Sequence, residues 1–295
     1  MATNPFSWFT SLFTKAKADG PYEVFHKNGQ LKCQGTYKDG HKDGPHESYS
    51  KKGHLESKGN YKDNKKEGLW ESYSATGDVL FSGSYISGQP DGTHNRFHNN
   101  GQLRDKQSYI NGKNEGLWEL FYANGQLKSR GDYKNGKREG SFEIYYNNGQ
   151  LRSKGSHHND KRDALYESYF ENGQLESTGS YKDGNKDGPW KEFYEYGQLK
   201  FSGSYIDGKQ DGFWEILHEN GQLKSAGSYR NDKQEGPFEE FSESGQLLVK
   251  EHYENGQKHG PYESYEDNGQ LKSRGSFKYG RLDGSFELYK DGVLQ

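Results

Sequence analysis

Residues 124–140 read NGQLKSRGDYKNGKREG, and close variants of this stretch recur through most of the chain. The leucine of the stretch, Leu127, returns every 24 residues, once as a valine. The series comprises Leu31, Leu55, Val79, Leu103, Leu127, Leu151, Leu175, Leu199, Leu223, Leu247 and Leu271. A spacing without insertions or deletions over 240 residues indicates a repeat array, in which each unit contacts mainly its neighbours.

Each repeat carries the signals of two β-strands joined by turns. In residues 127–134, side chains for one face alternate with charged side chains for the other, which is typical of a strand with one solvated face. Residues 118–121 read as the preceding strand, and the Asn-Gly pair at 124–125 joins the two as a hairpin. A second glycine-bearing turn at 135–140 leads into the next repeat. The sequence therefore predicts an all-β fold, an elongated, single-layer antiparallel meander or solenoid of 24-residue β-hairpin repeats.

A glycine lies in the middle of the predicted strand, where glycine normally weakens a sheet. Gly131 precedes the tyrosine column by two residues, and most repeats have glycine at the same position. The others are Gly35, Gly59, Gly83, Gly155, Gly179, Gly203, Gly227 and Gly275. Their recurrence predicts that an aromatic ring of the neighbouring strand lies over the bare backbone. Aromatic pairing across strands adds roughly 0.2–1 kcal/mol per pair.

Trp118 and Phe121 are three residues apart in the preceding strand, so a regular strand would turn them to opposite faces. Two arrangements fit this spacing. Either a β-bulge brings both rings to one face, or the sheet carries aromatic residues on both faces.

The composition suits such a sheet better than an ordinary globular core. Hydrophobic residues make up 28% of the 295 residues, and aromatic residues alone make up 15%. The 40 basic and 43 acidic residues are interleaved and give a net charge of −3, which lacks the basic footprint of a nucleic-acid-binding protein. Cys33 is the single cysteine, which excludes an intrachain disulfide. No apolar stretch reaches the ~18 residues of a membrane span and no secretory signal is evident, so we expect a cytoplasmic protein.

The repeat resembles a known family. Residues 133–140 and 181–188, together with the Asn-Gly-Gln-Leu loops, resemble MORN repeats and in particular the bacterial MORN-variant repeat. The resemblance covers about twelve repeats over residues 20–295 and implies a twisted single-layer sheet of stacked hairpins. Ordinary MORN side-chain packing is not expected here, because Trp118 replaces the second glycine of the ordinary repeat.

The same resemblance implies a non-enzymatic role. Variant-repeat proteins are often assigned to antitoxin or immunity groups of bacterial toxin systems, and similar arrays occur in phages. Other members of the wider family are scaffolds near membranes. None of these roles is catalytic.

A column of glutamates, among them Glu71 and Glu143, raises the question of paired catalytic carboxylates. Acid–base catalysis needs two carboxylates in different environments, whereas a repeat gives every copy nearly the same environment. We therefore expect these glutamates to pair across strands with a basic row that includes Lys32, Arg104, Lys128 and Arg152. No nucleophile–base pair and no phosphate-binding motif is identifiable, so the sequence predicts neither an enzyme nor a bound cofactor.

Histidines are the remaining candidates for chemistry. His94 and His98 lie close together in the sequence, and His157 and His158 are adjacent. His46 and His94 occupy the column that holds tryptophan or tyrosine in other repeats, and His157 occupies the tyrosine column. Replacement of one flat ring by another accounts for them. Because no Cys/His zinc spacing exists, we predict no metal site.

Residues 1–19 lie outside the period and form a separate N-terminal segment. An Asn-Pro pair can begin a short helix there, with aromatic residues along one stripe. The helix is either a cap over the edge of the first hairpin or an interfacial membrane anchor. An anchor would contact the membrane through Phe6, Trp8, Phe9 and Phe13. Repeat arrays generally need caps, which favours the first role.

The sequence predicts a repeat scaffold that binds a protein partner, either a toxin or a component of an assembly. The alternative is a structural element, such as a spacer, a fibre or a virion component, which would place a phage-encoded protein in the virion. Specificity in a repetitive protein can come from departures from the repeat, and these cluster in residues 92–115, 157–164 and 247–252. They are either drift and local bulges, which nearest-neighbour arrays tolerate, or a contact surface. That surface would comprise His94, Arg96, His98, His157 and His158.

Overall fold

The computed structural model describes residues 18–295, which form 28 β-strands and contain no helix. They divide into two compact units, one ending at Gly125 and one beginning at Gln126. The first unit contains β1 (Gly20–Phe25), β2 (Leu31–Lys38), β3 (His41–Tyr49), β4 (Leu55–Lys62), β5 (Lys65–Tyr73), β6 (Val79–Ile86), β7 (Gln89–Phe97), β8 (Leu103–Ile110), β9 (Lys113–Asn114) and β10 (Gly116–Phe121).

The second unit contains β11 (Leu127–Lys134), β12 (Lys137–Tyr145), β13 (Leu151–His158), β14 (Lys161–Tyr169), β15 (Leu175–Lys182), β16 (Asn185–Phe193), β17 (Leu199–Ile206), β18 (Lys209–Gln210), β19 (Gly212–Leu217), β20 (Leu223–Arg230), β21 (Lys233–Phe241), β22 (Leu247–Glu254), β23 (Gln257–Lys258), β24 (Gly260–Tyr265), β25 (Leu271–Lys278), β26 (Arg281–Leu282), β27 (Glu287–Lys290) and β28 (Val293–Leu294). The predicted N-terminal helix, with its two roles as cap or membrane anchor, falls in residues 1–17 and so lies outside the described residues.

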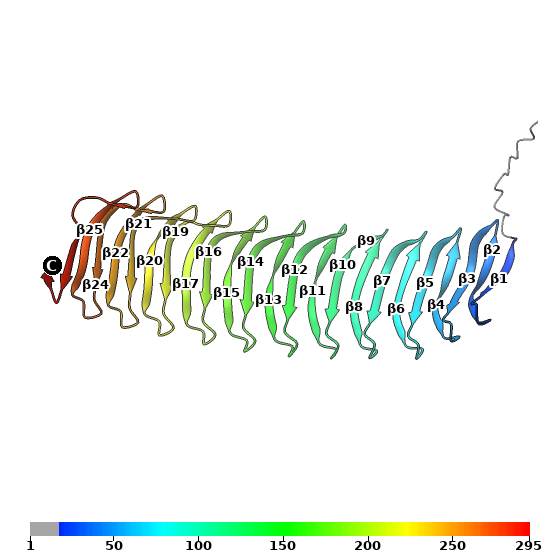
Figure 1. The fold of residues 1–295 in the computed structure, drawn as a ribbon. Coiled ribbons are helices and arrows are strands. Elements are labelled where there is room, and N and C mark those ends of the chain that lie inside the picture. The colour runs from blue at the N-terminus through cyan, green and yellow to red at the C-terminus, as the bar shows by residue number, and fades with distance from the viewer. Residues whose placement is uncertain (1–17) are drawn as a thin grey trace, which may run out of the picture. The chain divides into compact units, whose positions relative to one another are not determined.

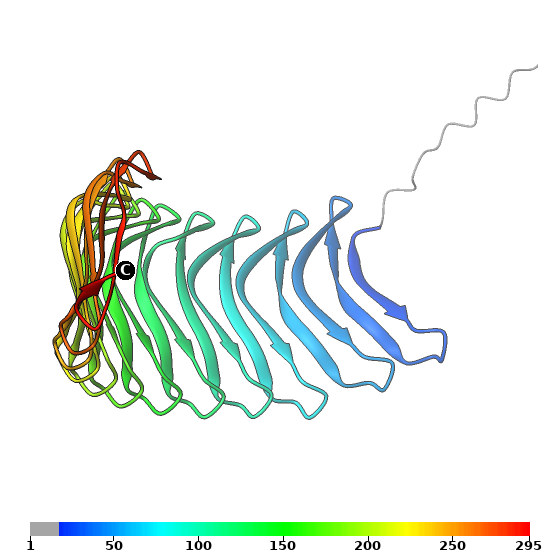
Figure 2. The ribbon, with the colours of Figure 1, turned by 60° about the vertical axis from the view of Figure 1, so that its left-hand side comes forward.

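Within each unit the strands form one layer (Figure 1, Figure 2). Consecutive long strands pair antiparallel, from β1 with β2 through β8 with β10 in the first unit, and likewise from β11 with β12 in the second. The two-residue strands, such as β9 and β18, directly follow a two-residue turn and pair with the strand before it. The next long strand begins shortly after each of them. The predicted single-layer antiparallel meander is therefore confirmed in each unit.

Two kinds of connection alternate along the chain. In the two-residue turn Asn135-Gly136 the φ angles are 53° and 84°, so both residues are left-handed. Two left-handed central residues define the type I′ turn, which favours Asn-Gly and Asp-Gly. Longer loops, such as residues 146–150, close with a 3.0 Å hydrogen bond from the Gly149 N–H to the Tyr146 carbonyl. Each unit thus has a turn edge, made by the two-residue turns, and a loop edge, made by the Asn-Gly-Gln loops and their variants.

The asparagines of the loop edge link successive repeats. The Oδ1 atom of Asn28 accepts a hydrogen bond from the Gln30 N–H at 3.2 Å, and its Nδ2 donates to the Lys51 carbonyl of the next loop at 2.8 Å. The same link to the next loop is made by Asn100, Asn172 and Asn220. The recurrence of Asn-Gly-Gln therefore has a physical reason: the asparagine shapes its own loop and holds the following one.

Acidic residues link successive repeats at the turn edge. Glu67 Oε2 accepts a hydrogen bond from the Ser87 N–H at 2.8 Å, 20 residues further along the chain. The same bond is made by Asp91, Glu139 and Glu235. Because both edges use fixed offsets, an inserted residue would break the links on either side of it.

A layer of aromatic rings over the mid-strand glycines forms the core of each unit. Trp70, Trp190 and Trp214 are only 3–4% exposed. A Cβ atom added at Gly179 would lie within 3.0 Å of the Trp190 ring, closer than real Cβ atoms approach their neighbours. Trp190 also packs edge-on against Tyr181, with ring centroids 5.6 Å apart. The prediction that rings cover the bare backbone is confirmed.

The sheet carries aromatic residues on both faces. Trp70 lies in the ring layer, whereas Tyr73 donates a 2.7 Å hydrogen bond to Glu71 Oε2 and lies under the Lys58 ammonium at 5.5 Å. Glu71 follows Trp70 directly and therefore points to the opposite face. We call the face with Trp70 the aromatic face and the face with Glu71 the charged face. The second of the two arrangements predicted for aromatic residues three apart is the one observed.

The glutamates pair across strands, but the basic partners predicted for them are wrong. Glu71 pairs with Lys58 at 3.1 Å, and the equivalent pairs are Glu143 with Arg130, Glu167 with Lys154 and Glu287 with Arg274. The predicted row of Lys32, Arg104, Lys128 and Arg152 lies two residues earlier in each strand, and the register does not place it opposite the glutamates. A register shift within these hairpins, for example between Lys58 and Asn60 in the pairing of β4 with β5, accounts for the offset. Without the shift, Glu71 would lie opposite Glu56, which has the repeat position of Lys32.

Alanine substitutions at two of the covered glycines test the ring-over-glycine contact. Neither Gly179 nor Gly155 has a positive φ, so alanine is conformationally allowed at both. At Gly155 the added Cβ would lie 3.0 Å from the Phe142 ring, whereas at Gly179 it would penetrate the Trp190 ring. We expect Gly179→Ala to cost about 3 kcal/mol in the free energy of unfolding and Gly155→Ala about 1 kcal/mol. Denaturant unfolding followed by tryptophan fluorescence measures both, and equal losses would contradict the contact.

Candidate functional site

The five residues of the predicted contact surface fall in different surroundings. His94 lies in the aromatic layer and is 4% exposed. Its Nε2 is 2.7 Å from the Ser84 carbonyl, and its ring centroid is 4.7 Å from that of Tyr109. Burial lowers the pKa of His94. The ring therefore replaces the tryptophan of other repeats and offers no surface to a partner.

Arg96 belongs to an ion-pair cluster on the aromatic face. Its Nη1 is 3.1 Å from Asp105 Oδ1, and the Nε of Arg104 is 2.9 Å from Asp105 Oδ2. Asp105 is only 6% exposed. Three other repeats have two serines here, such as Ser168 and Ser177 with their hydroxyls 2.7 Å apart. Residues 92–115 stood out in the sequence as a departure from the repeat, but the sequence did not identify Asp105 as the centre of this cluster.

His98 is part of the loop edge. Its Nε2 is 3.1 Å from the Phe121 carbonyl. His26 and His218 make the same contact with the carbonyls 23 residues ahead, and Tyr146 and Tyr194 make it with their hydroxyls. His98 therefore joins two repeats, as the aromatic side chains of these four other repeats do.

His157 and His158 belong to the second unit. The His157 ring is half-buried in the tyrosine column, with its centroid 4.5 Å from that of Phe142. Burial, with the nearby Arg138 and Arg162, lowers its pKa. His158 is exposed, and its Nδ1 lies 3.0 Å from Glu139 Oε1. Of the five predicted residues, Arg96 and His158 present the most accessible polar groups, and they belong to different units.

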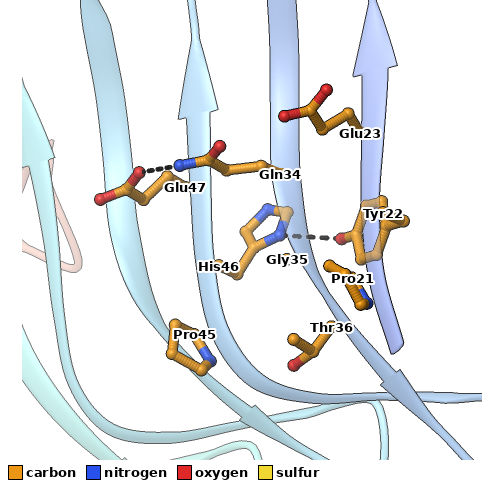
Figure 3. A pocket seen from close by; sticks show the side chains of 9 residues that line it. All are labelled: Pro21, Tyr22, Glu23, Gln34, Gly35, Thr36, Pro45, His46 and Glu47. Atoms are coloured by element: carbon orange, nitrogen blue, oxygen red, sulfur yellow. Dashed lines mark hydrogen bonds between the residues drawn. The ribbon is translucent and has the colours of Figure 1, made fainter. Parts of the chain in front are cut away.

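A hollow of about 310 Å³ lies at β1–β3 (Figure 3). The Tyr22 hydroxyl lies 3.0 Å from His46 Nδ1, and Gln34 Nε2 donates to Glu47 Oε2 at 2.6 Å. Burial raises the pKa of Tyr22 to about 12 and lowers the pKa of His46. Both rings are therefore neutral near pH 7, and their contact is a hydrogen bond between neutral groups. It does not provide a nucleophile.

Four large apolar side chains are exposed on the charged face of the first unit. Leu69, Ile86, Ile110 and Leu117 keep 47–56% of their surface exposed. At the same repeat positions most other repeats have proline, lysine or arginine, namely Pro45, Pro189, Pro237 and Pro261, or Lys38, Lys62, Lys134, Lys182 and Arg230. We call the four residues the apolar strip.

The strand register places the apolar strip on one face. Leu69 of β5 lies opposite Ser84 of β6. Because residues two apart in a strand share a face, Ile86 lies on the same face as Ser84 and Leu69. Residues that lie opposite one another on paired strands share a face. Ser82 of β6 lies opposite Asn95 of β7, Asn95 lies opposite Lys106 of β8, and Lys106 lies opposite Glu119 of β10. The charged face therefore continues from β6 to β10. The strip is not apparent in the sequence, because its members are far apart in the chain and only the register brings them to one surface.

Two further properties bear on function. Residues 18–295 contain no cluster of three or more His, Cys, Asp or Glu side chains arranged to hold a metal ion. The same residues form no helix long and apolar enough to cross a membrane.

Comparisons with known proteins give one strong similarity. The MORN repeat variant matches the chain ten times, at residues 18–39, 42–63, 90–111, 114–135, 138–159, 162–183, 186–207, 210–231, 234–255 and 258–279. No curated protein matches the chain.

Solved structures give only weak similarity. The crystal structure of TcdB2-TccC3 has 11% identity and a TM-score of 0.20, over 93% of this chain and 18% of that chain. The Photorhabdus luminescens Tc holotoxin pore has 12% identity and a TM-score of 0.18, over 92% of this chain and 16% of that chain. The chain thus spans less than a fifth of these proteins, and scores this low carry no argument about its structure or role.

The buried histidines predict that acid destabilises the protein. Burial lowers the pKa of His46, His94 and His157 below the ordinary value of 6.5. At pH values between the lowered pKa of the folded chain and the ordinary pKa of the unfolded chain, the unfolded chain binds more protons than the folded chain. The free energy of unfolding is therefore highest above about pH 6.5 and falls as the pH drops below that value. Denaturant unfolding at pH 7.5 and at pH 5.5 measures the loss. A triple variant with the rings of other repeats, H46W/H94W/H157Y, should lose clearly less, and an equal loss would show that other groups are responsible.

Proposed function

The chain belongs to the MORN repeat variant family, and from this membership we propose that it is a non-catalytic repeat scaffold that holds a protein partner on the charged face of its sheet. Members of the family are typically scaffolds rather than enzymes. Fold and family do not name a partner, so the argument for binding depends on the surface of this chain.

The apolar strip is the observation that carries the proposal. Exposed apolar patches with a polar rim mark interaction sites in soluble proteins, whereas single exposed residues are ordinary. The strip has four large aliphatic side chains at positions where most other repeats have proline or a charged residue. Its rim on the same face contains Glu71, paired with Lys58, and Glu119 opposite Lys106. Apolar contacts within a charged rim are the usual anatomy of a protein interface.

For the partner we propose a toxin that the scaffold neutralises, as in an antitoxin or immunity protein. The family resemblance supports this form. A role as a spacer, a fibre or a virion component is the competing interpretation, in which the same surface would contact a neighbouring subunit of the assembly.

Replacing isoleucines of the strip by the lysine of other repeats tests partner binding. The variant I86K/I110K introduces residues that β2, β4 and β11 already carry at this position, so folding should be preserved. We expect its affinity for the partner captured from the native host to fall by at least about tenfold, because buried apolar anchors dominate interface energies. Ile206→Lys, a change at the same repeat position in the second unit, is the matched control and should bind normally. A partner that binds I86K/I110K as tightly as the unchanged protein would refute the role of the strip.

The antitoxin form has a separate test. If a gene beside that of this protein encodes a growth-inhibiting toxin, co-expression of the unchanged protein should restore growth, and I86K/I110K should not. Absence of protection by the unchanged protein would reject the antitoxin form and favour the structural role.

A further inference from the structure

A basic hollow lies at the loop edge of the first unit. It measures about 450 Å³ and is lined by Phe25, His26, Lys27, Asn28, Lys32 and Lys51. Three of the six residues are lysines, and none is acidic. We call this site the basic notch.

The frame of the basic notch is built from neutral contacts. Asn28 donates to the Lys51 carbonyl, and His26 Nε2 lies 2.9 Å from the Tyr49 carbonyl. These bonds belong to the loop-edge links found along the chain, and they use Asn28 Nδ2 and His26 Nε2. Lys27, Lys32 and Lys51 make no ion pair within residues 18–295. Three like charges around one hollow repel one another, and an anion between them would relieve the repulsion.

The second unit contains the same hollow with the opposite charge. It also measures about 450 Å³, and its lining includes His218, Asn220 and Lys224 at the repeat positions of His26, Asn28 and Lys32. Glu219 and Glu243 take the places of Lys27 and Lys51. Asn220 donates to the Glu243 carbonyl as Asn28 donates to that of Lys51. The loop geometry is therefore common to both hollows, and the basic charge is specific to the first.

We propose that the basic notch binds a multivalent phosphate group. Lysine ammonium groups bind phosphate as point charges, and charge-assisted hydrogen bonds of this kind are about twice as strong as neutral ones. The notch offers three such groups from two successive repeats. Phe25, which is 55% exposed, forms an apolar wall beside them. The site therefore fits either a free phosphate or diphosphate, or the phosphate of an ester whose organic part lies against Phe25.

Titration with inorganic pyrophosphate and with phenyl phosphate tests the proposal, with binding measured by calorimetry on the full chain. We expect one site, weakened by added sodium chloride because exposed charges are screened. Pyrophosphate binding alone indicates a free phosphate or diphosphate ligand. Tighter binding of phenyl phosphate, lost in Phe25→Ala, indicates an ester.

The second unit supplies the matched variants. K27E/K51E copies the acidic hollow and should reduce pyrophosphate affinity by at least about tenfold, because it removes two of three charge-assisted bonds. E219K/E243K copies the basic notch and should add a second site of similar affinity. All four residues are exposed and their side chains make no bond within the described residues, so both variants should fold as the unchanged protein does. Unchanged affinity in K27E/K51E, or one site only in E219K/E243K, would overturn the proposal, and neither result bears on the apolar strip.

Discussion

The contact between an aromatic ring and a glycine backbone is the interaction on which the fold depends. A single-layer sheet has no second layer to bury its side chains, and only 28% of this chain is hydrophobic. The absence of a Cβ at Gly179 lets the Trp190 ring lie directly against the backbone, where it is 3% exposed. The Lys186 ammonium lies 3.8 Å from the ring centroid and covers its outer side, and burial lowers the pKa of this lysine. Rings, glycines and lysine stems thus perform the function that aliphatic side chains perform in a globular core.

The strict period follows from this packing and from the links at the two edges. A ring must meet the glycine of the neighbouring strand, the loop asparagine must reach the carbonyl 23 residues ahead, and the turn acid must reach the N–H 20 residues ahead. One inserted residue would put all three contacts out of register, because side chains of a strand change face at every residue. The repeat length is therefore fixed by three independent contacts, whereas exposed positions between them are not constrained.

Much of the fold could be predicted from the sequence because the period reports on contacts between neighbours. The alternation in residues 127–134 predicted a strand with two unlike faces, and the recurrent glycine predicted the covering ring. The basic partners of the glutamates could not be predicted, because they depend on register shifts such as that between Lys58 and Asn60, which the repeat pattern does not reveal. The same limit applies to the surface. His94 and Arg96 stood out as departures, yet one is buried and the other neutralises Asp105. The apolar strip obeys the repeat spacing and becomes visible only once strands are paired.

Separation of packing positions from exposed positions determines where function can reside. Changing Lys27 to the glutamate of the second unit, or Ile86 to the lysine of other repeats, alters a surface without touching a ring, a glycine or an edge link. A buried departure is different: Asp105 introduces a carboxylate where most other repeats have a serine, and it is tolerated because Arg96 and Arg104 both bond to it. Removing either arginine would leave a buried charge with half its partners. Exposed departures can therefore change independently of stability, whereas buried ones must change together with their partners. For this reason the strip and the basic notch, rather than the histidines of the ring layer, are the surfaces on which this array can acquire a ligand.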